Sequence, residues 1–376
     1  MSRSALLWAA LNMSFAARPG SRQRFIAGAG RGGAGWSSFL EPLVSELHPG
    51  WEQAARAELE RARALGVSVV TLEDAGYPAL LGASSDPPCL LYVRGGLLLE
   101  DSLSIAVVGS RRATPNGLEA ARGLGRALSA SGYTVVSGLA RGIDAAAHAG
   151  ALEGGGRTIA VLGSGLDRIY PAEHRRLAES IARQGAVVTE LPFGASPLKR
   201  HFPERNRVIA ALCWATVVVE AARDSGSLIT ADLAAEEGRS VYAVPGAVDD
   251  PNAEGTNGLL RAGALVCRSA ADVLEDIAPQ IAAAARAVAA ARPGGAAAGT
   301  KGSAPDSGPP DAQGLTLDER RVLSRLPKTR GVGIETLAES CGLAPGPLLA
   351  TLLELELRGL ARQLPGRRFT SAACKI

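Results

Sequence analysis

Four basic side chains lie within nine residues of the segment PLKRHFPERNRVIAAL (197–212), namely Lys199, Arg200, Arg205 and Arg207. The whole chain carries 40 Lys and Arg against 37 Asp and Glu, so its net charge does not explain this local excess. Phe202 lies within the cluster and can offer an aromatic face to a base. Cations that bind phosphates, grouped around a ring that stacks on a base, are typical of single-stranded nucleic-acid sites.

An alternative interpretation of the same segment needs no ligand. In this interpretation Phe202 belongs to the hydrophobic core, and the arginines pair with Glu204 and Glu220. The residue types alone leave both interpretations open.

Three other segments have the composition of anion-binding turns, because small residues stand between an apolar run and a helical stretch. They are GSR (109–111), SGLARGID (137–144) and DSGSLITA (224–231). Backbone N–H groups in such a turn, together with the positive end of the following helix, favour a bound phosphate. Arg111 and Arg141 would add positive charge, and Asp144 is well placed to cap the helix that follows its turn.

Other nucleotide-binding and catalytic motifs are missing or incomplete. No Lys follows a Gly at the spacing of a P-loop. The segment GSGLDR (163–168), with Glu190 closing the next apolar run, approaches a dinucleotide-binding fingerprint, but Arg168 replaces its third glycine. The four histidines show neither metal-binding spacing nor a nucleophile partner, and the adjacent Asp249 and Asp250 are typical of a solvated turn. The sequence therefore favours binding without catalysis and indicates no metal or cofactor.

Short apolar runs alternate with helical stretches between residues 104 and 267 and start 24 to 30 residues apart. The runs are SIAVV (104–108), TVV (134–136), TIAVL (158–162), AVVTE (186–190), TVVVE (216–220), SVYAV (240–244) and ALVC (264–267). This alternation predicts an α/β, Rossmann-like, doubly wound fold with a mainly parallel sheet. Ligands of such folds lie beyond the carboxyl ends of the strands, where the three turns would stand.

Composition divides the chain into four parts. Residues 1–76 are predicted to form a small helical N-terminal region, and residues 77–277 form the Rossmann-like domain. Ala, Gly, Pro and Ser dominate residues 278–314, which cannot bury a core and are predicted to form a flexible linker. Residues 315–376 regain the pattern of three helices and a hairpin, which predicts a winged helix.

The predicted winged helix is poorly suited to reading duplex DNA. It begins with a capping box formed by Thr316 and Glu319. Its third helix, GPLLATLLELELRG, carries Glu354 and Glu356, whereas a reading helix presents Arg, Lys, Asn or Gln to base edges. A structural role or a protein contact suits this part better.

Cysteine usage and hydropathy indicate the compartment. The five cysteines are odd in number, far apart and never in a CxxC pair, which argues against a disulfide framework or a structural zinc. No apolar run approaches the ~18 residues of a membrane span. Residues 5–17 make a poor signal peptide, because Arg3 alone precedes them and Asn12 interrupts them. We therefore expect a cytoplasmic protein without a membrane partner.

A series of specific motifs spans Tyr77 to Ser269: GSR, SGLARGIDAAAH, LGSGLDRIYP, HFPERNRVIA, VVVEA, SGSLITA, GRSVYAVPG and EGTNGLLRAGA. In this order they resemble the DNA-processing protein A family, DprA, also called Smf. The resemblance implies a non-enzymatic, cytoplasmic protein that binds and protects single-stranded DNA. It also implies a homodimer formed through the Rossmann-like domain, and a role in loading the recombinase RecA on DNA taken up in natural transformation. For residues 1–76 it implies a sterile-alpha-motif-like or helix-hairpin-helix region in degenerate form, which the first 50 residues fit poorly.

The motifs and the resemblance together indicate a set of DNA-binding residues and no catalytic residue. The set is Gly109, Ser110, Arg111, Ser137, Gly138, Arg141, Gly142, Lys199, Phe202, Arg205, Asn206, Arg207, Ser225, Gly226 and Ser227. Glu204 departs from the family pattern, which often has a basic residue at this position. This departure would weaken the local positive field.

Two other hypotheses come from different functional classes. Phosphoribohydrolases resemble the same fold, so a nucleotide-processing enzyme is one alternative. Those enzymes carry a PGGxGT loop, whereas this chain has PGAVDDPNAEGTN (245–257), and the insertion disfavours the enzyme. A duplex-DNA regulator acting through the winged helix is the other alternative, and the acidic third helix disfavours it.

Overall fold

The computed structural model describes residues 2–17, 40, 44, 50–291, 316–327 and 332–343, and between residues 348 and 371 it describes 348, 351–352, 354–356, 360–364 and 368–371. The chain forms two compact units, Met1–Val273 and Leu274–Ile376.

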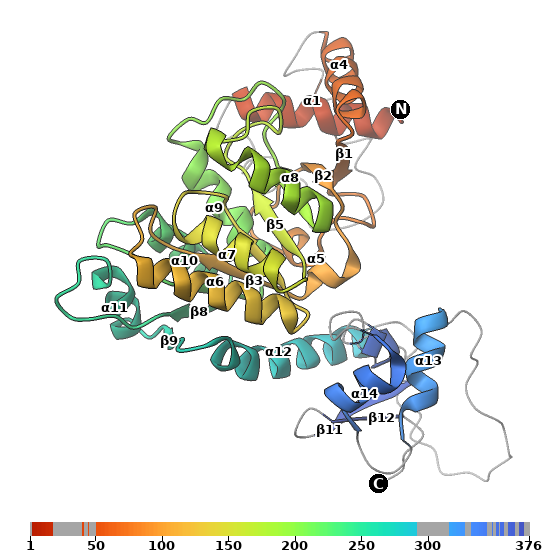
Figure 1. Cartoon of the computed structure of the whole chain (residues 1–376). Helices are drawn as coiled ribbons and strands as arrows, with labels where there is room; N and C mark the ends of the chain where they lie inside the picture. The colour runs from red at the N-terminus through yellow and green to blue at the C-terminus, as the bar shows by residue number, and fades with distance from the viewer. Residues whose placement is uncertain are drawn as a thin grey trace, which may run out of the picture. The chain divides into compact units, whose positions relative to one another are not determined.

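A mixed sheet forms the centre of the first unit (Figure 1), with the strand order β1-β2-β6-β5-β4-β3-β7-β8-β9. The strands are β1 (Ser68–Thr71), β2 (Leu90–Gly95), β3 (Ser104–Val108), β4 (Thr134–Ser137), β5 (Thr158–Val161), β6 (Ala186–Thr189), β7 (Ala215–Val218), β8 (Ser240–Ala243) and β9 (Leu265–Val266). Strands β3 to β9 pair in parallel, each with its neighbour in the sheet. The predicted doubly wound, mainly parallel sheet is confirmed.

Helices cover both faces of this sheet (Figure 1). They are α1 (Arg3–Ala17), α4 (Trp51–Ala64), α5 (Ala79–Gly82), α6 (Pro115–Ala130), α7 (Ile143–Glu153), α8 (Arg175–Gln184), α9 (His201–Leu212), α10 (Gly226–Glu236) and α11 (Glu254–Arg261), with 3-10 turns at Leu99–Ser102 and Ala172–His174. Side chains of α8 share a core cluster with Ala160 and Val187, whereas α9 packs on Val161 and Val188, the next residues along the same strands. Because neighbouring residues of a strand point to opposite faces, α8 and α9 lie on opposite sides of the sheet.

The antiparallel strands β1 and β2 extend the sheet beyond β6 and were not predicted. Strand β2 pairs with β6 through Tyr92 and Thr189, and β1 pairs with β2 through Val69 and Tyr92. β1 lies in the region 1–76 that was predicted to be helical, and β2 precedes the first apolar run of the predicted alternation. The boundary at residue 76 is therefore corrected, because the sheet begins at Ser68. These two short strands lie outside the regular alternation of strands and helices, so the alternation did not predict them.

Helix α1 belongs to the core of the first unit. Trp8 and Leu11 are fully buried, and Trp8 Nε1 donates to Glu73 at 3.2 Å. Asn12, the polar residue that interrupts the apolar segment, donates from Nδ2 to the carbonyl of Glu190 at 2.8 Å. The apolar composition of α1 is thus explained by its packing in the core. Within the described ranges, no helix is long and apolar enough to cross a membrane.

The chain reverses its direction of winding at β3. Strands β4, β5 and β6 follow one another away from β3, and the chain then returns to place β7 on the other side of β3. In doubly wound folds this reversal opens a crevice between the loops that follow the two central strands. The loops after Val108 and Val218 flank it here. The sequence predicted ligand binding at this edge of the sheet, and the strand order locates the crevice on that edge.

The second unit begins within α12 (Ala270–Ala291), which continues into the predicted linker 278–314. Residues 278–291 are therefore helical rather than linker, in keeping with the high helix propensity of alanine. Residues 292–314 lie outside the described part of the chain.

A helical and hairpin module follows. It contains α13 (Leu317–Arg325), β10 (Val332–Gly333), α14 (Ile334–Cys341), β11 (Ala361–Leu364) and β12 (Arg368–Ser371). The predicted capping box is confirmed, because Thr316 Oγ1 accepts from the N–H of Glu319 while the Glu319 carboxylate accepts from the N–H of Thr316. The predicted hairpin is also present, with Gln363 opposite Phe369. Residues of the third predicted helix are described only in part.

Candidate nucleic-acid interface

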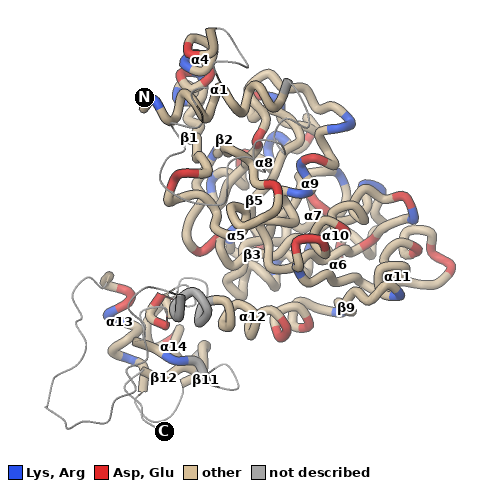
Figure 2. Tube along the Cα trace, turned by 180° about the vertical axis from the view of Figure 1, so that it is seen from behind, with Lys and Arg blue, Asp and Glu red and all other residues tan. Residues whose placement is uncertain are grey.

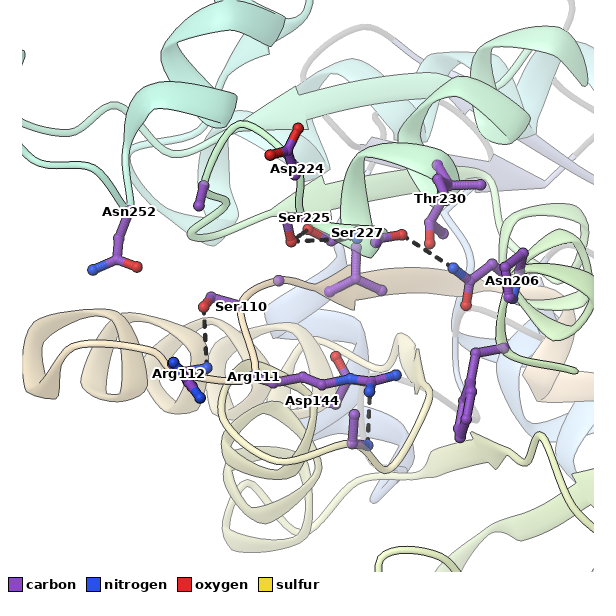
Figure 3. A pocket seen from close by; sticks show the side chains of 18 of the residues that line it. Ser110, Arg111, Arg112, Asp144, Asn206, Asp224, Ser225, Ser227, Thr230 and Asn252 are labelled. Carbon is purple, nitrogen blue, oxygen red and sulfur yellow. Dashed lines mark hydrogen bonds between the residues drawn. The ribbon is translucent and has the colours of Figure 1, made fainter. Parts of the chain in front are cut away.

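A cavity of about 650 Å³ occupies the crevice between the loops after β3 and β7 (Figure 3). Its walls come from the GSR turn, the first turns of α9 and α10, and the loop before α11. Residues from the predicted set that line it are Gly109, Ser110, Arg111, Phe202, Arg205, Asn206, Ser225, Gly226 and Ser227. Figure 3 shows Ser225 and Ser227 on one side and Arg111 and Arg112 on the other. Three segments far apart in the sequence thus meet at one site.

Close backbone contacts hold the GSR turn in place. The N–H of Ser110 donates to the carbonyl of Glu220 at 2.7 Å, and the N–H of Ile143 donates to the carbonyl of Ser110 at 3.2 Å. Gly142 has φ +76°, and a Cβ atom there would lie 2.2 Å from the Ser110 oxygen. Only glycine fits this position, so the role of Gly142 is to let the loops after β3 and β4 touch.

Two N–H groups at the N-terminus of α6 already have acceptors. Thr114 caps the helix by accepting from the N–H of Gly117 at 3.0 Å, and the Glu220 carboxylate accepts from the N–H of Thr114 at 2.9 Å. A phosphate in this position would meet a carboxylate. Glu220 therefore disfavours the predicted phosphate site at the start of this helix, and it is bound to Thr114 rather than to an arginine.

Arg111 and Phe202 form the exposed aromatic and cationic pair of the cavity. Arg111 is exposed, and its Cζ lies 4.8 Å from the centroid of the Phe202 ring. Phe202 is half-buried in the first turn of α9, and the ring of Tyr170 lies 5.8 Å away between centroids. A core role for Phe202 does not agree with this position. The arrangement can hold a flat ring beside an anion.

Arg205 has a structural position that the sequence analysis did not foresee. The residue is 5% exposed, and its Nη1 donates to the carbonyl of Gly138 at 2.7 Å and to the carbonyl of Val161. Burial lowers the pKa of its guanidinium to about 10, although the charge of Asp144 opposes this shift. Because its Nη1 serves backbone groups at two strand ends, Arg205 has a structural role that the sequence did not predict, and its phosphate contact stays a prediction.

The Asp144 carboxylate stabilises the loop after β4 by accepting hydrogen bonds from its backbone. Its Oδ2 accepts from the N–H groups of Gly138 at 3.1 Å and of Ala140 at 3.3 Å, so it holds the loop before its helix instead of capping α7. Burial raises the pKa of this carboxyl, against the opposing charge of Arg205. Leu139 between the two donors has φ +57°, a strained conformation for a residue with a side chain. The loop is therefore held rigidly.

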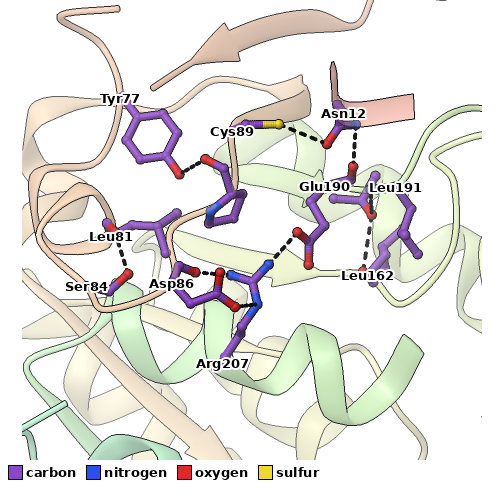
Figure 4. Close-up of polar contacts among 12 residues, drawn as sticks. Asn12, Tyr77, Leu81, Ser84, Asp86, Cys89, Leu162, Glu190, Leu191 and Arg207 are labelled. Carbon is purple, nitrogen blue, oxygen red and sulfur yellow. Dashed lines mark hydrogen bonds and ion pairs between the residues drawn. The ribbon is translucent and has the colours of Figure 1, made fainter. Parts of the chain in front are cut away.

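Arg207 lies on the other side of α9 and is also engaged (Figure 4). Its side chain is 12% exposed, its Nε lies 3.2 Å from Asp86 Oδ2, and its Nη2 pairs with Glu190 Oε2. These contacts join α9 to the segment before β2 and to the end of β6. The prediction that Arg207 binds phosphate is therefore corrected: the arginine pairs with acids, though not with those named from the sequence.

The DSGS turn supplies the polar wall of the cavity. Ser225 caps α10, and its hydroxyl lies 2.8 Å from that of Ser227. Asn206 Nδ2 donates to the carbonyl of Gly226 at 3.1 Å, which joins α9 to this turn. A Cβ atom at Gly226 would meet no atom within 4 Å, so this glycine borders open space.

The remaining predicted residues lie apart from the large cavity. Ser137 is fully buried and donates from Oγ to the carbonyl of Val107 at 2.6 Å, so its role is structural and its predicted DNA contact is corrected. Gly138 and Arg141 line a smaller adjoining hollow, and Arg141 pairs with Glu173. Lys199 is exposed in the loop before α9 but lines neither space.

Other residues at the site were not predicted. They are Tyr170, Arg112, Asp224, Thr230 and Asn252. Tyr170 stands in the motif LGSGLDRIYP after β5. Its position in a loop beyond the end of a strand could have identified it as a site residue. Basic and acidic residues are interspersed over the first unit (Figure 2), so composition alone could not separate lining residues from others. Within the described residues, no cluster of three or more His, Cys, Asp or Glu suits a metal ion.

Two protein-family models match most of the chain. The family described as DNA recombination-mediator protein A matches residues 68–278, beginning where β1 begins, and the DprA winged helix domain matches residues 306–367. Protein Smf of Escherichia coli (strain K12) is 38% identical over 293 residues, which are 77% of this chain and 74% of that protein.

Solved structures of two relatives share this fold. DNA processing protein A (DprA) from Streptococcus pneumoniae is 34% identical, with a TM-score of 0.59, and the match covers 73% of this chain and 96% of that one. DNA processing protein A from Helicobacter pylori, described for its single-stranded DNA binding mode, is 30% identical, with a TM-score of 0.52 over 57% of this chain and 96% of that one.

Proposed function

This chain belongs to the DNA recombination-mediator protein A family, and we propose that it binds single-stranded DNA in the crevice between the loops after β3 and β7. The observation that carries the proposal is the pair formed by exposed Arg111 and half-buried Phe202, 4.8 Å apart at the wall of the cavity. Stacking on a ring needs an unpaired base, and a cation beside that ring can neutralise the adjoining phosphate.

The proposed contacts differ in kind around the cavity. Phe202 stacks on a base, and Arg111 and Arg112 bind phosphates. Ser110 and the turn Ser225–Ser227 offer backbone and hydroxyl groups on the facing walls. Arg205 serves as scaffold beside them, since its Nη1 donates to carbonyls at two strand ends.

Binding should show little sequence preference. Two amide side chains, those of Asn206 and Asn252, line the cavity. Asn206 donates to Gly226 and accepts from Arg205 Nε at 3.2 Å, which fixes its orientation and uses one of its two donors and one of its two lone pairs. Stacking and phosphate contacts, which are common to all nucleotides, then supply most of the affinity.

A titration with labelled DNA tests this function. We expect single strands to bind more tightly than a duplex of the same length, with similar affinity for strands of different sequence. The matched control is Arg183→Ala, because Arg183 is exposed on α8 and lines neither the main cavity nor the adjoining hollow, so its loss should leave the affinity nearly unchanged. Equal affinity for duplex and single strand would contradict the proposal.

We further propose the finer role that family membership supports: a cytoplasmic homodimer that protects incoming DNA and helps load RecA during natural transformation. Two measurements test it. Sedimentation of the purified protein reports the oligomeric state. RecA filament assembly on strands coated with single-strand-binding protein should accelerate when this protein is added. An unchanged rate would remove the loading role and leave DNA binding untouched.

We also propose that the site binds without catalysis. Asp144, the buried carboxylate of the cavity, already accepts two loop N–H groups and would have to release them to act as a base. The alternative is a nucleotide-processing enzyme, because a cavity of about 650 Å³ could also admit a mononucleotide. Incubation with nucleoside monophosphates separates the two: release of free base would favour the enzyme.

A further inference from the structure

A smaller hollow of about 190 Å³ adjoins the main cavity on the other side of the Arg111–Phe202 pair. It lies between the loops after β4 and β5 and the first turn of α9. Arg111, Arg112, Ala140 and Phe202 line both spaces. The two spaces are therefore neighbours separated by a shared wall, and a chain molecule that leaves one can enter the other.

Tyr170 supplies an aromatic wall of this hollow. It is 41% exposed, and its ring is inclined by 52° to that of Phe202 at a centroid distance of 5.8 Å. Rings inclined in this way do not cover each other's faces. Tyr170 thus keeps surface on which a flat group can stack.

Glycines keep the hollow open. A Cβ atom at Gly163 would lie 3.2 Å from Cδ1 of Phe202, and one at Gly138 would lie 2.4 Å from Arg205 Nη1. Side chains at these two positions would fill the space or displace its neighbours. The small residues of the motif LGSGLDRIYP, which resembled a dinucleotide fingerprint, thus make room beside an aromatic ring.

Cations stand at the rim of the hollow. Arg112 is exposed, and Arg141 pairs with Glu173 through side chains that are 57% and 50% exposed. An ion pair this exposed contributes little stability, so a phosphate can compete for Arg141.

We propose that this hollow is a second nucleotide subsite, in which an unpaired base stacks on Tyr170 while Arg112 and Arg141 bind its phosphates. The inference rests on the proposed function, because it takes the same ligand, single-stranded DNA, one step further along the protein. Consecutive bases of one strand then lie on either side of the Arg111–Phe202 wall. The strand crosses this wall instead of ending in the main cavity.

Fluorescence of 2-aminopurine, placed at each position of a short oligonucleotide in turn, tests the subsite, because stacking on an aromatic ring quenches it. We expect quenching at two positions in the wild type and at one position in Tyr170→Leu. We expect Tyr170→Leu to bind single strands about tenfold more weakly, since stacking is lost while apolar bulk is kept. Tyr170→Phe, which keeps the ring, should stay within twofold of the wild type.

Melting temperature and crosslinking complete the test. If the Tyr170–Phe202 contact is only structural, Tyr170→Leu lowers the melting temperature without removing a quenched position, and the subsite is overturned. Should that variant not fold, photocrosslinking of wild type to 5-iodouracil DNA decides: a crosslink at Tyr170 supports the subsite, and crosslinks confined to other residues overturn it. Wild type that binds no single-stranded DNA contradicts the proposed function itself, whereas binding with unchanged Tyr170 variants contradicts the subsite alone.

Discussion

Arg111 and Arg205 line the same cavity, but their surroundings give them different roles. Arg111 stands on an exposed turn and contacts an aromatic face, so its charge is available to a ligand. Arg205 lies beneath the floor, where its guanidinium donates to carbonyls at the ends of β4 and β5. The difference teaches that a basic motif can combine ligand-binding residues with structural ones.

Replacement of Arg205 by Ala should have the largest effect, and it should appear in stability. The substitution leaves two carbonyls without their donor and removes the charge near buried Asp144, so we expect a loss of about 3 kcal/mol or more in the free energy of unfolding. Urea unfolding measures this. Arg205→Lys, which keeps one charge and some donors, should recover part of the loss. A fully stable Arg205→Ala protein that binds DNA weakly would place Arg205 with Arg111 as a ligand-binding residue.

Replacement of Phe202 by Ala should act on binding instead. Loss of stacking costs roughly 1–3 kcal/mol per base, so single-strand affinity should fall about tenfold or more. The dependence of affinity on salt should stay nearly the same, because no charge is removed. Phe202→Tyr, which keeps the ring, is the matched control. A large drop in melting temperature with unchanged affinity of the folded fraction would return Phe202 to the core.

The buried His148, which lies near Arg205, predicts a dependence of stability on pH. Burial lowers the pKa of His148 to about 3, and the charges of His174 and Arg205 act in the same direction. The unfolded chain therefore binds a proton near pH 6.5 that the folded protein does not bind. Stability should be greatest above pH 6.5 and fall as pH is lowered, by about 1.4 kcal/mol per unit between pH 6.5 and 3.

Urea midpoints at several pH values measure this fall. His148→Gln removes the titrating group from both states and should flatten the slope by one proton. An equal slope in this variant would assign the acid sensitivity to other residues.

Replacement of Arg111 by Ala should change the salt dependence by one contact. Each phosphate contact on a single strand contributes about 0.7 to the slope of log K against log salt, and the variant should lose that amount. Lys199→Ala should have a smaller effect than Arg111→Ala, because Lys199 lines neither the main cavity nor the adjoining hollow. Equal effects of both substitutions would show that the bound strand extends to the loop before α9.

The smallest effect is expected from Glu173→Gln, which releases Arg141 from its ion pair. A freed guanidinium should bind DNA slightly more tightly and steepen the salt slope by up to one contact. Glu179→Gln, an exposed acid farther along on α8, is the control. An unchanged slope in Glu173→Gln would mean that Arg141 does not reach the DNA.

Local patterns determined the alternation of β3 to β9 with their helices and the capping box of α13, and they placed the three small-residue turns at the carboxyl ends of the strands. These features follow from residue type and spacing within short segments, which the chain order preserves. Strands β1 and β2 lack that support, since they pair antiparallel outside the repeating units. The helical start of the predicted linker was also missed, because its alanines suit a helix as well as a flexible segment.

Only the tertiary structure decided which arginines are free. Arg205 and Arg207 lie two positions apart in a basic motif, yet their partners come from β4, β5, β6 and the segment before β2. Tyr170 likewise meets Phe202 from a segment about thirty residues away in the chain. Charge is a property of the residue and can be read from the sequence. Exposure depends on what distant segments place beside that residue, so the folded arrangement alone separates the cations that face a ligand from those that hold the site together.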